Sequence, residues 1–99
     1  MKLHEIAHGR TGDKGNTSNI SIIAYRPEDW PLILREVTEA RVAEVFGPEL
    51  RVTRYVLPQL NAMNFVIEGA LKGGVTRSLA IDAHGKALSF ALLDMELTP

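Results

Sequence analysis

Two segments of the chain combine β-branched and apolar residues and are bounded by turn-forming residues. In residues 19–25, Ile20, Ile22 and Ala24 share one face of an extended chain, an alternation that predicts a buried strand. Residues 51–57 have the same character and end at Pro58. We therefore predict strands over 19–25 and 51–57.

A helical spacing of apolar residues follows the first of these segments. Ile33, Val37 and Ala40 recur at the helical period between residues 29 and 46, and Asp29 is suited to the N-cap. Gly47 follows directly and is typical of a helix end. We predict one helix over 29–46.

The remaining segments are less uniform. Met63 and Ile67 favour a second helix over 60–71, although residues 65–67 suit a strand equally well. Residues 2–10 and 75–82 are short and mixed, as strands are, and a cluster of turn formers over 11–16 predicts a loop. Residues 86–97 suit a helix or a strand, and we favour a strand with a bulge.

The predicted element order is ββαβαββ. In a chain of 99 residues, this order is satisfied by two helices on one side of a mainly antiparallel sheet, a two-layer α+β sandwich. No repeat or linker-like stretch divides it, so residues 1–99 are interpreted as a single domain. A domain of this size has a limited core and strand edges to protect, which predicts a homo-oligomer.

Composition and charge exclude several classes of function. The 11 basic and 12 acidic residues give a net charge of −1, without the basic stripe of a nucleic-acid-binding protein. The chain has no cysteine, which rules out disulfides, thiolate metal sites and cysteine nucleophiles. There is no long apolar run or leader pattern, so we expect no membrane association and a cytoplasmic location.

Residues 8–19 hold the densest group of candidate chemistry. Arg10 and Lys14 are cationic, Asp13 can orient either of them or exchange a proton, and glycines allow backbone N–H groups to converge. Such a loop could bind a carboxylate or phosphate. The alternative is a structural connection in which Asp13 pairs with Arg10 or Lys14. The nucleotide-binding glycine motifs are absent.

A metal site is a weaker alternative. His4 and His8 would share a face of the predicted first strand, and Asp13 could add a third ligand. A histidine beside a polar loop is more often solvated, so we expect neither a metal nor a cofactor. No nucleophile motif is present, and no catalytic residue is assigned.

A resemblance to a known family begins at the same loop. The string from Ala7 to Gly15, followed by Asn19-Ile20, resembles the opening of the AtuA-like ferredoxin-fold domain. Asn64-Phe65, Gly73-Gly74-Val75 and the stretch over 78–86 also resemble that family. The resemblance implies a ferredoxin-like sandwich and a link to acyclic terpene utilisation, in which such compounds are degraded as acyl-CoA thioesters. By matching position it implies ligand-binding residues, namely Arg10, Asp13, Lys14, Asn19 and Asn64.

Three hypotheses about function follow. In the first, the chain is an accessory binding module of a larger AtuA-type chain in acyclic terpenoid or branched acyl-CoA catabolism. In the second, it is a small enzyme in which Arg10 and Lys14 bind a carboxylate or acyl-CoA and Asp13 is the general acid or base. In the third, it is a structural oligomerisation domain. The residue types are the same in all three, so solvent exposure of the loop is needed to separate them.

Overall fold

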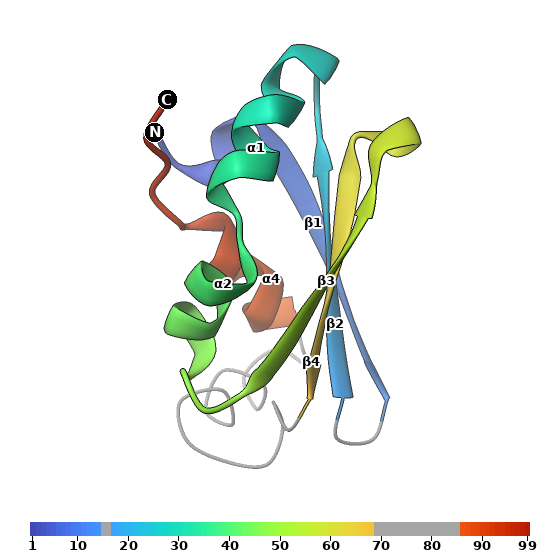
Figure 1. The fold of residues 1–99 in the computed structure, drawn as a ribbon, viewed down its shortest axis with the longest axis vertical. Helices are drawn as coiled ribbons and strands as arrows, with labels where there is room; N and C mark the ends of the chain where they lie inside the picture. The colour runs from blue at the N-terminus through green and yellow to red at the C-terminus, as the bar shows by residue number, and fades with distance from the viewer. Residues whose placement is uncertain (15–16, 69–85) are drawn as a thin grey trace.

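The computed structural model describes residues 1–14, 17–68 and 86–99, without the side chains of residues 13–14 and 86–88. The described strands form one antiparallel sheet in the order β1-β2-β4-β3. Their bounds are Ala7–Lys14 (β1), Thr17–Ala24 (β2), Arg51–Leu57 (β3) and Ala62–Glu68 (β4). Among these strands, β1 and β3 are the outermost, and Figure 1 shows the twist of the sheet.

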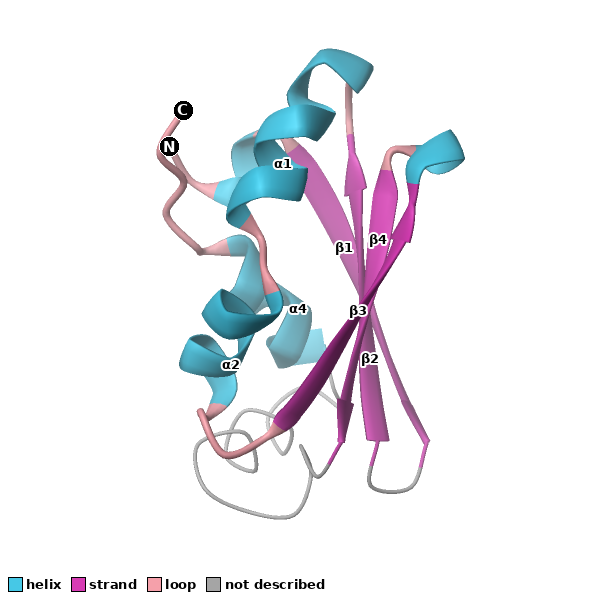
Figure 2. Cartoon of the chain, viewed as in Figure 1, coloured by secondary structure: helices cyan, strands magenta, loops and turns pink. Residues whose placement is uncertain are grey.

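The described helices cover one face of this sheet. They are α1 (Trp30–Glu36), α2 (Glu39–Phe46) and α4 (Lys86–Leu93), and all lie on the same side of the strands (Figure 2). Short 3₁₀ turns span Leu3–Glu5 (η1), Pro27–Asp29 (η2) and Pro58–Leu60 (η3). The predicted α+β class and antiparallel sheet are confirmed. None of the described helices is long and apolar enough to cross a bilayer.

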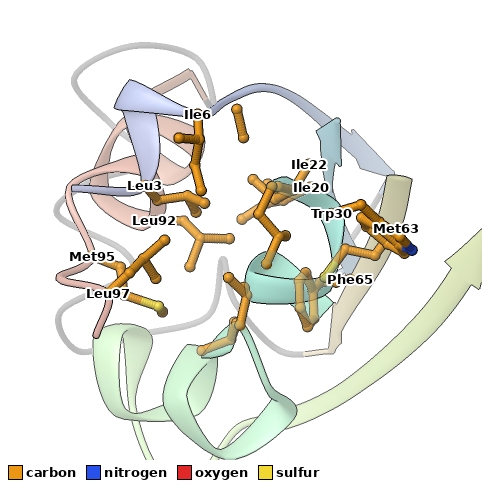
Figure 3. Packing of buried hydrophobic residues seen from close by; sticks show 14 of the residues in the cluster. Leu3, Ile6, Ile20, Ile22, Trp30, Met63, Phe65, Leu92, Met95 and Leu97 are labelled. Atoms are coloured by element: carbon orange, nitrogen blue, oxygen red, sulfur yellow. The ribbon is translucent and has the colours of Figure 1, made fainter. Parts of the chain in front are cut away.

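The core lies between the sheet and the helices. Alternate residues of β2 and β4 point inward and are fully buried, namely Ile20, Ile22, Met63, Phe65 and Ile67. Helix and terminal residues meet them from the other side, including Leu3, Ile33, Val42, Phe46 and Leu92; Figure 3 shows part of this packing. Trp30 is also part of the core.

The first predicted strand and the loop after it are wrong in their bounds. Residues 3–5 form η1, and β1 continues to Lys14 through most of the predicted loop. Each position from Ala7 to Lys14 has a partner in β2, ending with Lys14 opposite Thr17. This pairing satisfies the backbone polar groups of the alternate residues that point toward β2, so the segment is a strand despite its turn-forming residues.

The predicted long helix is divided in two. Thr38 has an extended backbone, and its hydroxyl accepts the Arg41 N–H at 3.3 Å as the N-cap of α2. Asp29 does occupy the N-cap position of α1, but its side chain makes no capping hydrogen bond there. A threonine that caps a new helix starts it again in a different direction.

Two further predictions are wrong in type. Residues 62–68, predicted within a helix, form β4. The spacing of Met63 and Ile67 was ambiguous, because residues four apart share a face of a strand as well as of a helix. Residues 86–93, predicted as a strand, form α4, in which Ser89 and Leu92 are buried while Phe90 is exposed. The predicted order ββαβαββ therefore does not hold. The predicted strand over 75–82 lies outside the described residues.

Arg54 joins the outer strand β3 to the helix layer. Its guanidinium Nη1 donates to the carbonyls of Leu34 at 2.9 Å and Val37 at 2.8 Å, which lie at the C-terminal end of α1. The Arg54 N–H, in turn, donates to Glu39 Oε2 at 2.7 Å. The Arg54 side chain thus satisfies two carbonyls at the end of α1. Its backbone N–H, which points away from β4, is satisfied by Glu39.

Glu36 holds the C-terminal segment against the helices. The Thr98 N–H donates to Glu36 Oε1 at 3.0 Å, and Arg35 Nη2 donates to the Thr98 carbonyl at 2.6 Å. The Thr98 hydrogen bond, supported by the charges of Arg35 and Arg41, lowers the pKa of Glu36. The N-terminal segment lies beside the same tail (Figure 1), where the Leu97 N–H donates to the Met1 carbonyl at 2.7 Å.

Replacing Arg54 by methionine should destabilise the fold by about 1.5–3 kcal/mol, because partly buried hydrogen bonds from a charged donor are lost. Arg51→Met is the matched control on the same strand. Arg51 is exposed and its Nε lies 3.9 Å from Glu68 Oε2, so its loss should cost less than about 1 kcal/mol. Urea denaturation of both variants measures the difference, and equal losses would contradict the role of Arg54.

The contribution of Glu36 should depend on pH. Because its pKa is lowered in the folded chain from an ordinary value of 4.5, the stabilisation is present above that value and is lost as the pH falls through the folded-state pKa. Glu36→Gln should therefore be less stable than the wild type near neutral pH, with the gap closing in acid. Glu44→Gln, at an exposed position of α2, is the control; a gap that is independent of pH would refute this account.

Candidate functional site

The register of the sheet places one polar row across all four described strands. Arg10 lies opposite Ser21, Ser21 lies opposite Asn64, and Asn64 lies opposite Tyr55. Directly opposed residues of antiparallel strands share a face, and this face is the one that the described helices leave uncovered. Asn64 Nδ2 donates to Ser21 Oγ at 2.9 Å, so the centre of the row is ordered by its own hydrogen bond.

We call this surface the open face. It consists of the outward positions of the strands whose side chains are described, namely His8, Arg10, Gly12, Thr17, Asn19, Ser21, Ile23, Arg51, Thr53, Tyr55, Leu57, Ala62, Asn64, Val66 and Glu68. Three of the predicted site residues, Arg10, Asn19 and Asn64, belong to it. With strands about 4.8 Å apart, the Cα atoms of Arg10 and Asn64 are separated by about 10 Å. Asn64 lies on a strand, although it was predicted on a helix.

Gly12 and Asn19 form the neighbouring row. A Cβ atom at Gly12 would lie 3.2 Å from Asn19 Oδ1, so the Asn19 amide extends over the glycine. This contact brings Asn19 toward β1, on the same face as Arg10. The glycine allows the amide to lie flat against the strand rather than forming part of an anion-binding turn.

A side chain at Gly9 would be hindered by different neighbours. A Cβ atom there would lie 3.1 Å from the Ser21 carbonyl and 3.2 Å from Ile22 Cδ1, with Leu93 Cδ1 at 3.6 Å. Gly9 therefore permits the close approach of Ser21 and Ile22 of β2, while Leu93 of α4 lies at an ordinary contact distance. The predicted convergence of glycine N–H groups in one loop is wrong for Gly9 and Gly12, since both lie within β1.

Asp13 and Lys14 are also part of β1, with Ser18 and Thr17 as their respective partners. Their side chains are outside the described residues, and so is the predicted ion pair of Asp13 with Arg10 or Lys14. Backbone positions on a strand alternate between faces. Positions 10 and 13, an odd number of residues apart, therefore belong to opposite faces of β1.

Arg10 is distinguished by its lack of an internal partner. Within the described residues its guanidinium makes no ion pair or hydrogen bond, and its side chain is exposed. The other described arginines are all engaged with carboxylates or carbonyls, namely Arg26, Arg35, Arg41, Arg51 and Arg54. Arg10 is therefore the arginine of this set that is free to bind an external anion.

A shallow hollow of about 390 Å³ lies beside Arg10. It is lined by Gly9, Arg10 and Thr11 of β1 and by Ser89 and Phe90 of α4. The Ser89 N–H donates to Thr11 Oγ1 at 3.0 Å and joins the two elements. The Phe90 side chain is 66% exposed, so an aromatic ring and a cation lie at one opening.

A second hollow, of about 350 Å³, lies beside β3 and is lined by Thr38, Glu39, Ala40, Arg54 and Val56. Its charged groups already have partners, because Glu39 accepts from the β3 backbone and Arg54 donates to α1 carbonyls. This hollow is explained by the junction between the strand and the helices.

One end of the open face is apolar and aromatic. The rings of His8 and Tyr25 stack with centroids 5.2 Å apart. Tyr55, Leu57 and Leu60 are 55%, 42% and 65% exposed at the same end of the sheet. The sequence analysis did not identify these residues, because their grouping depends on the pairing of strands that are distant in sequence.

The described histidines do not form a metal site. His4 lies in η1 and His8 on β1, so the shared strand face that the metal hypothesis requires does not exist. Among the residues that the structure describes, no group of three His, Asp or Glu side chains is placed to hold a metal ion. His84, Gly73-Gly74 and Arg77 lie outside the described residues.

The charges that perturb carboxyl groups lie away from the open face. Within the described part, the pKa is lowered for Glu36 by its Thr98 hydrogen bond and for Glu96 by the N-terminal amine. Both carboxyls hold the C-terminal segment. The described side chains of the open face offer hydrogen bonds, charge and apolar contact.

Comparison with known proteins gives one result. Searches of curated proteins and of solved structures find no significant match. The family model of the AtuA ferredoxin-like domain matches residues 1–98, which includes the β1 motif and Asn64. The antiparallel sheet with helices on one face agrees with a ferredoxin-like fold. The chain therefore belongs to the AtuA ferredoxin-like domain family.

Proposed function

We propose that the chain is an accessory binding module that works with a larger AtuA-type chain in acyclic terpenoid or branched acyl-CoA catabolism. The pathway part of this proposal comes from the association of the family with acyclic terpene utilisation. The binding part is supported chiefly by one observation: the open face carries exposed aromatic and apolar side chains beside an ordered polar row.

The apolar end of the open face is suited to the centre of an interface. Tyr25 and Tyr55 are more than half exposed, as is Leu60. Transfer of a large apolar side chain out of water contributes about 1.5–3 kcal/mol. Tyrosine is enriched at the centres of protein interfaces. A partner that covers this end would gain from their burial.

The part of the polar row formed by Arg10, Ser21 and Asn64 would be the adjoining rim. The hydrogen bond of Asn64 to Ser21 leaves the Asn64 carbonyl oxygen as an acceptor, while Arg10 supplies unpaired donors. An apolar centre beside polar groups that are already ordered is the usual composition of a specific interface. Asn64 and Ser21 would lose little conformational entropy on binding, because their mutual hydrogen bond already orders them.

The two other hypotheses receive less support. A catalytic loop requires Arg10, Asp13 and Lys14 to converge, whereas all three are positions on a strand. An oligomerisation domain would cover the open face with a second copy of the chain, so the size of the isolated chain is part of the test.

Tyr55→Asp should weaken the complex with the larger AtuA-type chain from the same genome by at least about tenfold, because a charge replaces a ring at the centre of the interface. Ala40→Asp is the matched control: it adds the same charge at an exposed position of α2, on the other side of the molecule. Titration calorimetry with both purified chains measures the affinities.

Circular dichroism should show that both variants melt like the wild type. Equal affinities of the two variants, or no complex between the wild-type chains, would refute the proposal. A stable dimer of the isolated chain that Tyr55→Asp dissociates would favour the oligomerisation hypothesis instead.

A further inference from the structure

The hollow beside β1 contains both a free cation and an exposed aromatic ring. Arg10 makes no ion pair or hydrogen bond within the described residues, and no described acidic residue lines the hollow. Phe90, from α4, presents its ring at the same opening. A guanidinium that lacks a carboxylate partner is available to a ligand that supplies one.

The hydrogen-bond pattern of β1 adds backbone donors at this edge. The Tyr25 N–H donates to the Ile6 carbonyl at 3.0 Å. Hydrogen-bonded and non-hydrogen-bonded pairs alternate along an antiparallel ladder. In the observed register, the polar backbone groups of Arg10 therefore point toward β2, whereas those of Gly9 and Thr11 point away from it.

The opposite side of the sheet confirms this alternation. The Ala24 N–H donates to the Asn61 carbonyl at 3.0 Å, and continuing the alternation across β4 directs the Arg54 N–H outward from β3. Glu39 Oε2 accepts that N–H at 2.7 Å. A carboxylate thus already binds an outward strand donor at β3, while the equivalent donors of β1 line the hollow.

We propose that the hollow between β1 and α4 binds a small carboxylate that carries an apolar chain. One carboxylate oxygen accepts from the Arg10 guanidinium, and the other accepts from an outward N–H of Gly9 or Thr11. The apolar chain lies along the Phe90 ring. A volume of about 390 Å³ is near the lower end of small-molecule sites, so the ligand is a small acid. Of the residues that line the hollow, Arg10 also belongs to the open face, so the site is tested on the isolated chain.

The test is a titration of the isolated, isotopically labelled chain, followed by the amide signals in NMR spectra. Octanoate supplies charge and chain together. Acetate and phosphate supply charge alone, and octanol supplies the chain alone. Octanoate should give saturable shifts centred on Gly9, Thr11 and Phe90, and should bind more tightly than the other probes.

Variants then test each half of the site against a control. Arg10→Gln should weaken octanoate binding by about tenfold or more, as for loss of a charged hydrogen bond, while Arg26→Gln, an exposed arginine at the start of η2, leaves it unchanged. Phe90→Ser should weaken it several-fold, while Val56→Ser, at an exposed apolar residue of β3 outside the hollow, does not.

Four results would overturn the proposal: no saturable shifts at millimolar octanoate; shifts centred elsewhere; equal affinity in Arg10→Gln and Arg26→Gln; or octanol or acetate binding as tightly as octanoate. None of these results depends on whether the larger chain binds the open face.

Discussion

Burial of alternate residues against one layer of helices is the constraint on which the rest of the structure depends. Ile20, Ile22, Met63, Phe65 and Ile67 are fully buried on the inner face. A slip of one residue would turn such a strand over and expose them, at a cost of about 1.5–3 kcal/mol for each side chain. The register is therefore strongly specified. The polar row of the open face follows from it, because the row consists of the residues that alternate with this core.

The same physics explains which elements could be predicted from the sequence. The strands near 19–25 and at 51–57 were predicted well, because runs of β-branched residues between turn-forming residues are typical of strands and not of helices. β4 was misread as a helix because a spacing of four residues between Met63 and Ile67 is compatible with both periods. Residues 86–93 were misread as a strand, in which Phe90 and Leu92 would share a face; in α4, Leu92 is buried whereas Phe90 is exposed. The break before α2 could have been found from Thr38, a threonine placed to cap a helix.

The candidate site was predictable only in part, and for a related reason. The family resemblance selected Arg10, Asn19 and Asn64, which the strand pairing does bring to one face. Tyr55 joins them only through the pairing of β3 with β4, a contact that no local pattern encodes. Phe90 was missed because α4 was expected to be a strand. Local sequence indicated where the polar chemistry is, whereas its apolar neighbours depend on tertiary contacts.

An uncovered sheet face in a small domain indicates a binding surface, because the apolar side chains on it are buried only when a partner covers them. The central claim is that this face is exposed to solvent in the isolated chain. The most direct measurement is relaxation enhancement of NMR signals by a soluble paramagnetic chelate. The Asn64 side-chain amide and the Tyr55 ring should be strongly broadened, whereas the Ile20 methyls and the Phe65 ring should be unaffected. If Asn64 and Tyr55 were as protected as Phe65, the face would already be covered in the isolated chain, and the account would be contradicted.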